Sequence, residues 1–477
     1  MKHTFNKLLC LVLALVMVIG MLPATMFASA ADVVVMNANQ LLVDDDFDGI
    51  ANKVKVQATV GGVVYEAVMG DNAFTSIAEA ISKASLNTQI YVAAGTYSEN
   101  FNITQNMEIY GNGMNVNPNN EDWSANAKRA DLTKETVLHN STVGITAKGA
   151  TNVVFNGFSF TGKSSLKETT SGSTIKGMDI SYNCFYDNEQ ISANQGVIYI
   201  TGTTVRSGRI AYNRVENSVA EAKPITFRNA NNFVFQGNYF NVTATVALWL
   251  TAETADKNTT PGQMRISMLD NYVVATEYAF QMMLYYANLV EITAKNNYAK
   301  AQYPLCIDAH EETVRTKTIT VENNTFDGSK IDLWFKVRSG VPTYDASVMK
   351  IKNNTFVSGY VTNAWVDAAA MDLSYNTFKK TPVIDCIPSA IMYPTYDGNG
   401  NVVGAMELDS VELTGVKKSG DKSTISGVSI DNAAKTVSLK DATASDFANI
   451  EVVATPKVAD STVTAKYYKD QIGRAHV

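Results

Sequence analysis

One short motif recurs along the chain and constrains its fold more than any other feature. It has the form apolar-x-x-Asn-x-apolar, and its asparagines are Asn183, Asn213, Asn238, Asn271, Asn297, Asn324, Asn354 and Asn376. Successive asparagines are 30, 25, 33, 26, 27, 30 and 22 residues apart. A period of this size is typical of folds in which one structural unit stacks on the next. The motif therefore predicts a stack of coils.

The segments between the asparagines predict strands rather than helices. They are short, rich in β-branched and aromatic residues, and they alternate apolar with polar positions. We expect an all-β fold, a parallel β-helix, in which each strand lies about 4.8 Å from its counterpart in the next coil. Each asparagine would hydrogen-bond to the asparagines above and below it. Residues 155–160 repeat the motif one coil earlier, with Phe158 in the asparagine position.

The first thirty residues have the features of a bacterial-type signal peptide. Lys2 and Lys7 precede the apolar run Leu8–Leu22, and Ala28–Ala30 forms a small-x-small cleavage site. We expect cleavage after Ala30 and export of the mature chain, which would be extracellular or held at the cell surface. The alternative is a membrane anchor, but the run is short for one. No later stretch approaches the length that spans a membrane.

Charge and cysteine content exclude two other classes of protein. Removal of Lys2 and Lys7 changes the formal net charge from −7 to −7 − 2 = −9, so we expect no nucleic-acid partner. Of the four cysteines, Cys184, Cys306 and Cys386 remain in the mature chain. Their spacing fits neither a disulfide framework nor a metal site.

A short helix is predicted ahead of the coils. Within residues 73–84, Ile77 and Ala80 share one face with Ile81 and Ala84, and Ser76 with Glu79 forms a capping box. This helix would cover the N-terminal end of the stack.

The same region carries a resemblance to a known family. The runs Ala73–Ile81 and Ile90–Glu99 are similar to the first coil of pectin-lyase-like right-handed β-helix proteins, and Val43–Phe47 resembles their first strand. The similarity spans residues 41–390 and implies a right-handed parallel β-helix. Members of this family include polysaccharide lyases, glycoside hydrolases, esterases, epimerases and surface proteins. The later catalytic motifs of the methylesterases and polygalacturonases are absent from this sequence, so the resemblance implies no particular reaction.

Alternation in the strand that follows each motif identifies residues on one outer face. With Leu305 and Ile307 pointing inward, for example, Cys306 and Asp308 point outward. The outward residues with catalytic side chains are Asp308, His310, Lys336, Arg338 and Asp367. Those suited to binding substrate are Arg228, Trp249, Tyr285, Trp334 and Trp365. Aromatic rings beside charged groups are typical of a sugar-binding surface, since rings stack on pyranose faces.

Three roles stay open for this face. Asp308 and Asp367, two coils apart, would lie about 9–10 Å from each other, near the separation in inverting glycosidases. His310 or Lys336 could instead remove a proton beside a uronate that Arg338 neutralises. Alternatively, Asp308, Lys336 and Asp367 only alternate in charge along the stack. We therefore expect a secreted, cell-envelope protein that binds polysaccharide and leave open whether it cleaves it; the alternative is a non-catalytic adhesin or a structural surface protein.

One acidic segment makes calcium a candidate ligand. Asp44, Asp46 and Asp48 precede Gly49 as in a calcium-binding loop, but the twelfth position is Lys55 rather than an acid. No other cofactor is predicted.

The sequence divides into four parts. Residues 1–30 form the signal peptide and residues 31–395 the β-helix. Short alternating strands at 405–470 predict a partial Ig-like β-sandwich. Residues 471–477 resemble translated sequencing adapter, and we interpret them as a non-native tail.

Overall fold

The structure is a computed structural model. It describes residues 33–124, 128–168, 175–186, 196–201, 206–217, 224–251, 262–284, 287–309, 316–337, 348–363, 371–373, 375–380, 383–385, 390–391, 394–396, 402–405, 408–417, 422–424, 428–431, 436–439 and 447–456. The predicted signal peptide and the predicted tail lie outside these residues. No helix in these ranges is long and apolar enough to cross a membrane.

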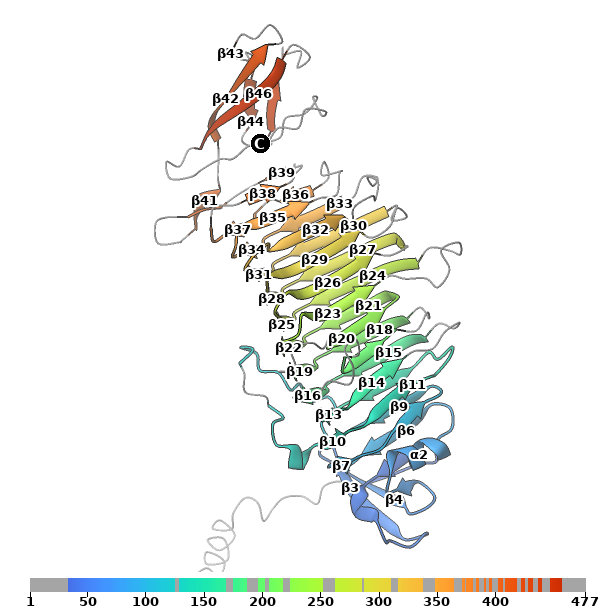
Figure 1. Cartoon of the computed structure of the whole chain (residues 1–477). Coiled ribbons are helices and arrows are strands. Elements are labelled where there is room, and N and C mark those ends of the chain that lie inside the picture. The colour runs from blue at the N-terminus through green and yellow to red at the C-terminus, as the bar shows by residue number, and fades with distance from the viewer. Residues whose placement is uncertain are drawn as a thin grey trace, which may run out of the picture.

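Most of the described chain forms three parallel sheets, which we name I, II and III in the order in which each coil visits them (Figure 1). The strands of sheet I are β5 (Ala73–Phe74), β2 (Gln40–Val43), β6 (Thr88–Val92), β9 (Met107–Tyr110), β12 (Val153–Asn156), β15 (Ile175–Ser181), β18 (Arg206–Ala211), β21 (Ala230–Gln236), β24 (Gly262–Leu269), β27 (Ala287–Lys295), β30 (Thr316–Glu322), β33 (Val348–Lys352), β36 (Met371–Leu373) and β39 (Ala390–Ile391).

Sheets II and III have eleven strands each. Those of sheet II are β7 (Gly95–Tyr97), β10 (Thr136–His139), β13 (Phe158–Thr161), β16 (Cys184–Tyr186), β19 (Arg214–Asn217), β22 (Tyr239–Val242), β25 (Tyr272–Val274), β28 (Tyr298–Ala301), β31 (Thr325–Gly328), β34 (Thr355–Phe356) and β37 (Thr377–Phe378). Those of sheet III are β8 (Phe101–Ile103), β11 (Thr142–Ile145), β14 (Ser165–Glu168), β17 (Ile198–Ile200), β20 (Ile225–Arg228), β23 (Val246–Thr251), β26 (Tyr278–Leu284), β29 (Tyr303–Ala309), β32 (Leu333–Val337), β35 (Tyr360–Asn363) and β38 (Val383–Asp385).

This arrangement is β-helix-like, as the repeat predicts. From β6 to β36 every strand pairs in parallel with the strand three positions later in the chain, and at the N-terminal end of sheet I β2 pairs with both β5 and β6. Inward residues from all three sheets form one continuous apolar core, in which Phe155, Phe235, Phe280 and Ile307 are at most 1 % exposed. Alternation within the strands thus separates a core side from an outer side.

The predicted asparagine ladder is confirmed. All eight asparagines are buried, and from Asn183 to Asn354 each donates its side-chain amide to Oδ1 of the next, over 2.8–3.1 Å. Each also donates to a backbone carbonyl of the preceding coil, as Asn297 does to Met268. The backbone N–H of Phe158 donates to Asn183 Oδ1, so Phe158 occupies the ladder position of its coil.

The residue before each ladder position has a left-handed backbone. In the described coils φ is 55–63° at these positions, occupied by Tyr182, Tyr212, Gly237, Asp270, Asn296, Asn323, Asn353 and Tyr375. Gly157 precedes Phe158 with φ 86°, and a Cβ atom there would lie 2.2 Å from the backbone N of Met114. The turn between sheets I and II therefore has a left-handed residue at the same position in every described coil from the β12–β13 turn onward.

The N-terminal region differs in part from the prediction. The helix α2 is shorter than expected, Ile77–Lys83, because the chain before it forms β5; Ser76 caps it by accepting from the Glu79 N–H. The strand expected at Val43–Phe47 ends at Val43, and a 3₁₀ turn follows. A second small core, which the sequence did not reveal, lies beside an additional sheet of β1 (Val33–Val35), β3 (Lys55–Val60) and β4 (Val63–Val68).

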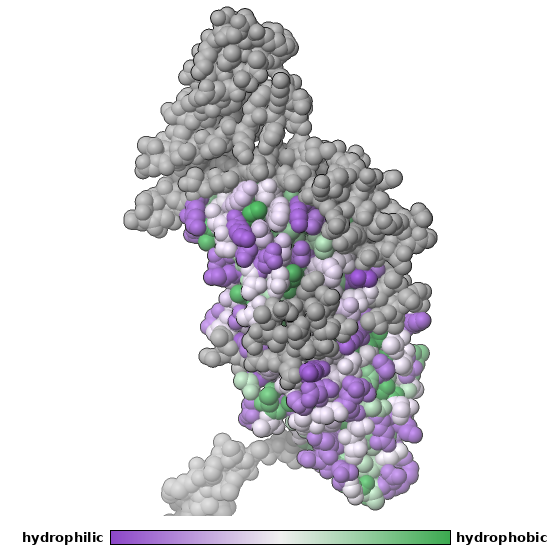
Figure 2. Space-filling model, in the orientation of Figure 1, coloured by the Kyte–Doolittle hydropathy of each residue, from purple (hydrophilic) through white to green (hydrophobic). Residues whose placement is uncertain are grey.

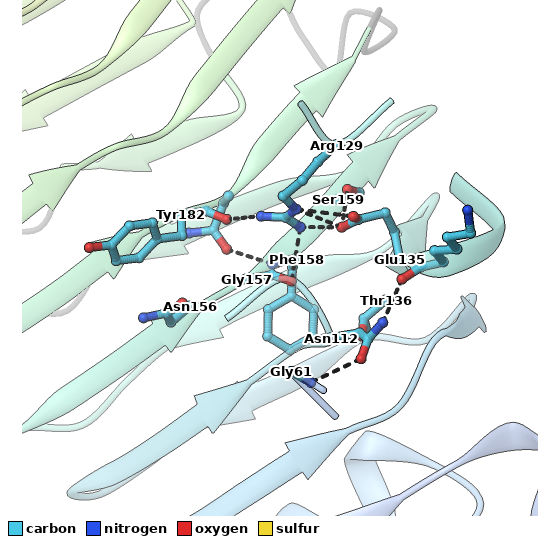
Figure 3. A network of polar contacts seen from close by, with 12 residues as sticks. Gly61, Asn112, Arg129, Glu135, Thr136, Asn156, Gly157, Phe158, Ser159 and Tyr182 are labelled. Atoms are coloured by element: carbon cyan, nitrogen blue, oxygen red, sulfur yellow. Dashed lines mark hydrogen bonds and ion pairs between the residues drawn. The ribbon is translucent and has the colours of Figure 1, made fainter. Parts of the chain in front are cut away.

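A long loop between β9 and β10, also not anticipated, crosses the outer side of sheet II (Figure 1). We call this loop, residues 111–135, the strap; residues 125–127 of it lie outside the described ranges. Its buried Arg129 pairs with Glu135 and donates to the carbonyls of Gly157 and Tyr182 in two successive coils (Figure 3). Asn119, also buried, donates to the carbonyls of two later coils.

The described C-terminal strands are antiparallel. The strands β40 (Pro394–Tyr396) and β41 (Val402–Ala405) form one hairpin, and β44 (Val428–Asp431) and β45 (Thr436–Leu439) form another. A three-stranded sheet consists of β42 (Leu408–Lys417), β43 (Lys422–Thr424) and β46 (Phe447–Pro456). The strand expected at 463–467 lies outside the described residues.

Candidate functional site

The outer side of sheet III carries the residues that the sequence selected. Strand register places one outward residue of each coil in a single row, which consists of Tyr199, Thr226, Trp249, Gln281, Cys306, Trp334 and Thr362. Trp249 and Trp334 therefore lie three coils apart, a separation of about 14 Å by strand spacing. Gln281 and Cys306 lie between them.

Each tryptophan contacts a residue of the neighbouring coil within this interval, and the two contacts lie toward opposite ends of the strands. The indole N–H of Trp249 lies 2.8 Å from Sδ of Met283, one coil further along the stack. The ring of Trp334 packs against Tyr303, one coil back, with centroids 4.9 Å apart. Both indoles are partly exposed. They mark the two ends of a stretch of the outer side of sheet III that is two coils wide.

An aromatic row runs along the beginning of these strands. Tyr278 stacks on Tyr303 at 5.0 Å, and Tyr303 in turn contacts Trp334. Two ammonium groups lie over these rings: Lys330 Nζ is 5.6 Å from the Tyr303 centroid and Lys336 Nζ is 5.0 Å from that of Trp334. Because the rings stack on one another, a ligand would meet mainly their edges and the outer face of Trp334.

The opposite side of the interval is charged. Asp308 and Lys336 are neighbours in register, and Lys336 Nζ lies 3.5 Å from Asp308 Oδ2. The expectation that Asp308 is accessible is wrong: it points away from the core but is 2 % exposed, while the side chain of Lys336 is 36 % exposed. Cys306, also predicted to face outward, is fully buried. Burial, aided by the Asp308 carboxylate, raises the pKa of Cys306 to about 12, so its thiol is protonated at neutral pH.

The other predicted residues fall into two groups. Arg228 is half-buried on β20 and shares the row of Asp308, three coils earlier. Five predicted site residues lie outside the described residues or strands: Tyr285, His310, Arg338, Trp365 and Asp367. The proposed pairing of Asp308 with Asp367 is therefore untested.

One predicted strand position differs in the structure. The sequence placed Trp365 and Asp367 on the outer strand of the coil after Trp334, but the described strand there ends at Asn363, and its residue in register with Trp334 is Thr362. The strand of that coil, Tyr360–Asn363, begins earlier than the apolar pattern indicated. Trp334 is therefore the last tryptophan of the described row.

Sequence reasoning missed Tyr278, Tyr303 and Lys330. Both tyrosines are the first residues of their strands, one step before the alternation that was used to assign directions. Lys330 lies in the turn before β32. The available signal was the repetition of Tyr two residues before Phe280 and Leu305, the first inward residues of their strands.

The acidic segment forms a compact cluster but keeps local roles. Carboxylate oxygens of Asp44, Asp45 and Asp46 lie within 4.8 Å of one another. Asp44, whose pKa is raised by burial, caps the 3₁₀ turn by accepting from the Asp46 N–H. Lys55, at the twelfth position, pairs with Glu66. This arrangement explains the segment as a turn and adds no argument for calcium.

Comparison with known proteins identifies no relative. No family model matches the chain, no curated protein matches it, and no solved structure matches it.

Proposed function

We propose that the protein binds polysaccharide on the outer side of sheet III, between Trp249 and Trp334. The observation that carries this proposal is that two partly exposed tryptophans, one of them beside Lys336, border two coils that present Tyr278 and Tyr303. Aromatic surface gives apolar contact to the sugar, and ammonium groups can donate hydrogen bonds to hydroxyl or carboxylate oxygens. Figure 2 shows the described part of the visible surface as a mixture of hydrophilic and hydrophobic residues.

Binding without cleavage accounts best for the described charges. Asp308 is buried and paired with Lys336, so its carboxylate is poorly placed to protonate a glycosidic oxygen or to activate water. The pair supports the interpretation in which charge alternates along the stack. The lyase and hydrolase hypotheses require His310, Arg338 or Asp367 and stay predictions.

The wider proposal places this function at the cell envelope. The signal-peptide pattern of residues 1–30 supports export. The coil motifs support membership of the pectin-lyase-like family, with right-handed coils, α2 as the N-terminal cap and an Ig-like module at 405–470. Together these features favour a secreted surface protein that retains a glycan.

Affinity gel electrophoresis tests the proposal. The mature protein would be run through gels that contain homogalacturonan, alginate, β-glucan or arabinoxylan. We expect retardation in at least one gel, and its loss in the double variant Trp249→Ala, Trp334→Ala. The control is Tyr212→Asn, which removes an aromatic ring from a different corner of the coil and keeps a residue that tolerates its left-handed backbone. Equal retardation of the double variant and the control would contradict the proposal.

A further inference from the structure

The outward side of sheet II also forms a continuous row. Register aligns Ser159, Cys184, Arg214, Tyr239, Tyr272, Tyr298, Thr325, Thr355 and Thr377. The first three are fully buried and Tyr239 is 3 % exposed. From Tyr272 onward every member is partly exposed. The row is thus closed in its first half and open in its second.

The strap closes the first half. Its Glu135 accepts from Ser159 Oγ, and the carbonyl of Ser124 lies 3.4 Å from the Arg214 guanidinium. The described strap reaches furthest along the row at Trp123, whose ring lies 6.4 Å from that of Tyr239 and 5.9 Å from that of Tyr272. Trp123 therefore marks the boundary between the closed and open parts.

The Trp123 ring stands across the row. It is within 22° of parallel to Tyr239 and Tyr272, and these tyrosines stack on each other and on Tyr298 along the stack of coils. Rings that stack along this direction have one face toward the preceding coil and the other toward the following coil. Because Trp123 is partly exposed, we infer that it forms a wall at the end of the open part.

The backbone of Trp123 is held in a strained conformation. Its φ of 56° lies in the left-handed region, which is unfavourable for a bulky side chain. The turn around it is fixed, because Trp123 N–H donates to the Asn120 carbonyl and Asn120 donates its amide to Ser124 Oγ. Asn119, 1 % exposed, anchors the turn to the coils, and its Oδ1 has no hydrogen-bond partner within the described chain.

Polar, mostly uncharged groups line the open part. Thr325, Thr355 and Thr377 supply one hydroxyl per coil, and the exposed Asn296, Asn323 and Asn353 form a parallel row of amides at the adjoining turn. Beside them, Lys300 and Asp327 neutralise each other at 3.0 Å, and Tyr298 donates to Asp327. Hydroxyl and amide groups at one set per coil suit a regular polymer of neutral sugars.

We propose that the open part of this row binds the end of a linear neutral polysaccharide, whose terminal sugar abuts Trp123. The following sugars would lie over Tyr298 and the threonines. Because the strap closes the row at Trp123, a chain that lies along it must end there. The site goes beyond the function proposed above, since it lies on a different sheet and selects chain ends.

Tryptophan fluorescence tests this proposal independently of sheet III. The triple variant Trp249→Phe, Trp334→Phe, Trp365→Phe retains one tryptophan, Trp123. It also lacks the two indoles of the site proposed on sheet III. We expect cellohexaose, mannohexaose or xylohexaose to quench its emission. Adding Thr325→Val and Thr355→Val, which leave the strap untouched, should weaken this binding on the order of tenfold, as the loss of two hydrogen bonds implies. At equal mass, a long polymer of the same linkage should quench less than the hexasaccharide, in proportion to its fewer ends.

Three results would overturn the proposal. These are no quenching by any of the three hexasaccharides, unchanged affinity in the threonine variant, and equal quenching by hexasaccharide and polymer at the same mass. These three measurements do not depend on Trp249 or Trp334. The gel experiment on sheet III and the fluorescence experiment on sheet II can therefore each fail without affecting the other.

Discussion

Replacement of one ladder asparagine should destabilise the coil stack strongly. In Asn297→Ala four buried hydrogen bonds disappear: two that Asn297 Oδ1 accepts from Asn271, and two that its amide donates to Asn324 and Met268. At about 1 kcal/mol of net stability for each bond, the loss is about 4 kcal/mol. The backbone N–H of Asn271 is left buried without its acceptor, which adds to the cost. A matched control is Asn241→Ala on the exposed side of β22, which should cost less than about 0.5 kcal/mol.

Replacement by aspartate gives a second, pH-dependent result. In Asn297→Asp one carboxylate oxygen keeps the acceptor role, but the other faces the oxygens of Asn324 and Met268 that the amide used to satisfy. The carboxylate would therefore be disfavoured in the folded state, so its pKa would rise above the unfolded value of about 3.9. A raised carboxyl pKa means that stability is highest below the unfolded pKa and is lost as pH rises through the folded pKa. Asn297→Asp should thus be weakest at pH 7 and recover toward pH 4.

Urea denaturation followed by circular dichroism, combined with hydrogen exchange, measures both effects. Since stacked coils can open locally, the exchange rate at the Asn271 amide reports the damage even where the global midpoint moves little. Two results would refute the reasoning: a midpoint and an Asn271 exchange rate in Asn297→Ala equal to those of Asn241→Ala, or stability of Asn297→Asp that is unaffected by pH between 4 and 7.

Two further predictions concern buried groups outside the ladder. Arg129→Met should lower the free energy of unfolding by about 3–5 kcal/mol, because Glu135 is left as an uncompensated buried charge. In the same urea titration, the double variant Arg129→Met, Glu135→Gln should recover part of this loss. A double variant as unstable as the single variant would count against the proposed role of the ion pair. Cys184 and Cys306 should resist iodoacetamide at pH 8 in the native protein and react in urea, because both thiols are buried and burial raises their pKa. Peptide mapping by mass spectrometry measures the labelling of each cysteine. Labelling of either one in the native protein would contradict its burial.

The coil architecture could be predicted because its main determinant is local and repeated. Every coil carries the same asparagine in the same short context, and the ladder joins each asparagine to the next one and to the carbonyl three residues before the preceding one. A left-handed residue precedes each asparagine, and Asn, Asp, Gly or Tyr occupies that position. Eight repetitions of one local solution leave few alternative folds.

The candidate site could be predicted only in part, because alternation gives direction and not exposure. It correctly placed Trp249, Trp334, Asp308 and Lys336 on one outer side. It could not show that Asp308 and Cys306 are covered, since burial depends on chain segments distant in sequence. The strap illustrates the same limit: Asn119 contacts Gly237, 118 residues away, and no periodicity in the sequence signals that contact.

The ladder also explains why site dimensions in this fold are insensitive to coil length. Successive ladder asparagines are separated by as few as 22 and as many as 33 residues, yet their side chains meet at 2.8–3.1 Å throughout. The additional residues must therefore lie in the turns, while strand pairing fixes the rise of each coil at about 4.8 Å. The interval between Trp249 and Trp334, and that between Tyr272 and Thr377, are thus set by the number of coils. Insertions in turns can change what borders these surfaces without changing the spacing of the groups along them, whereas deletion of one whole coil would shorten a surface by one step.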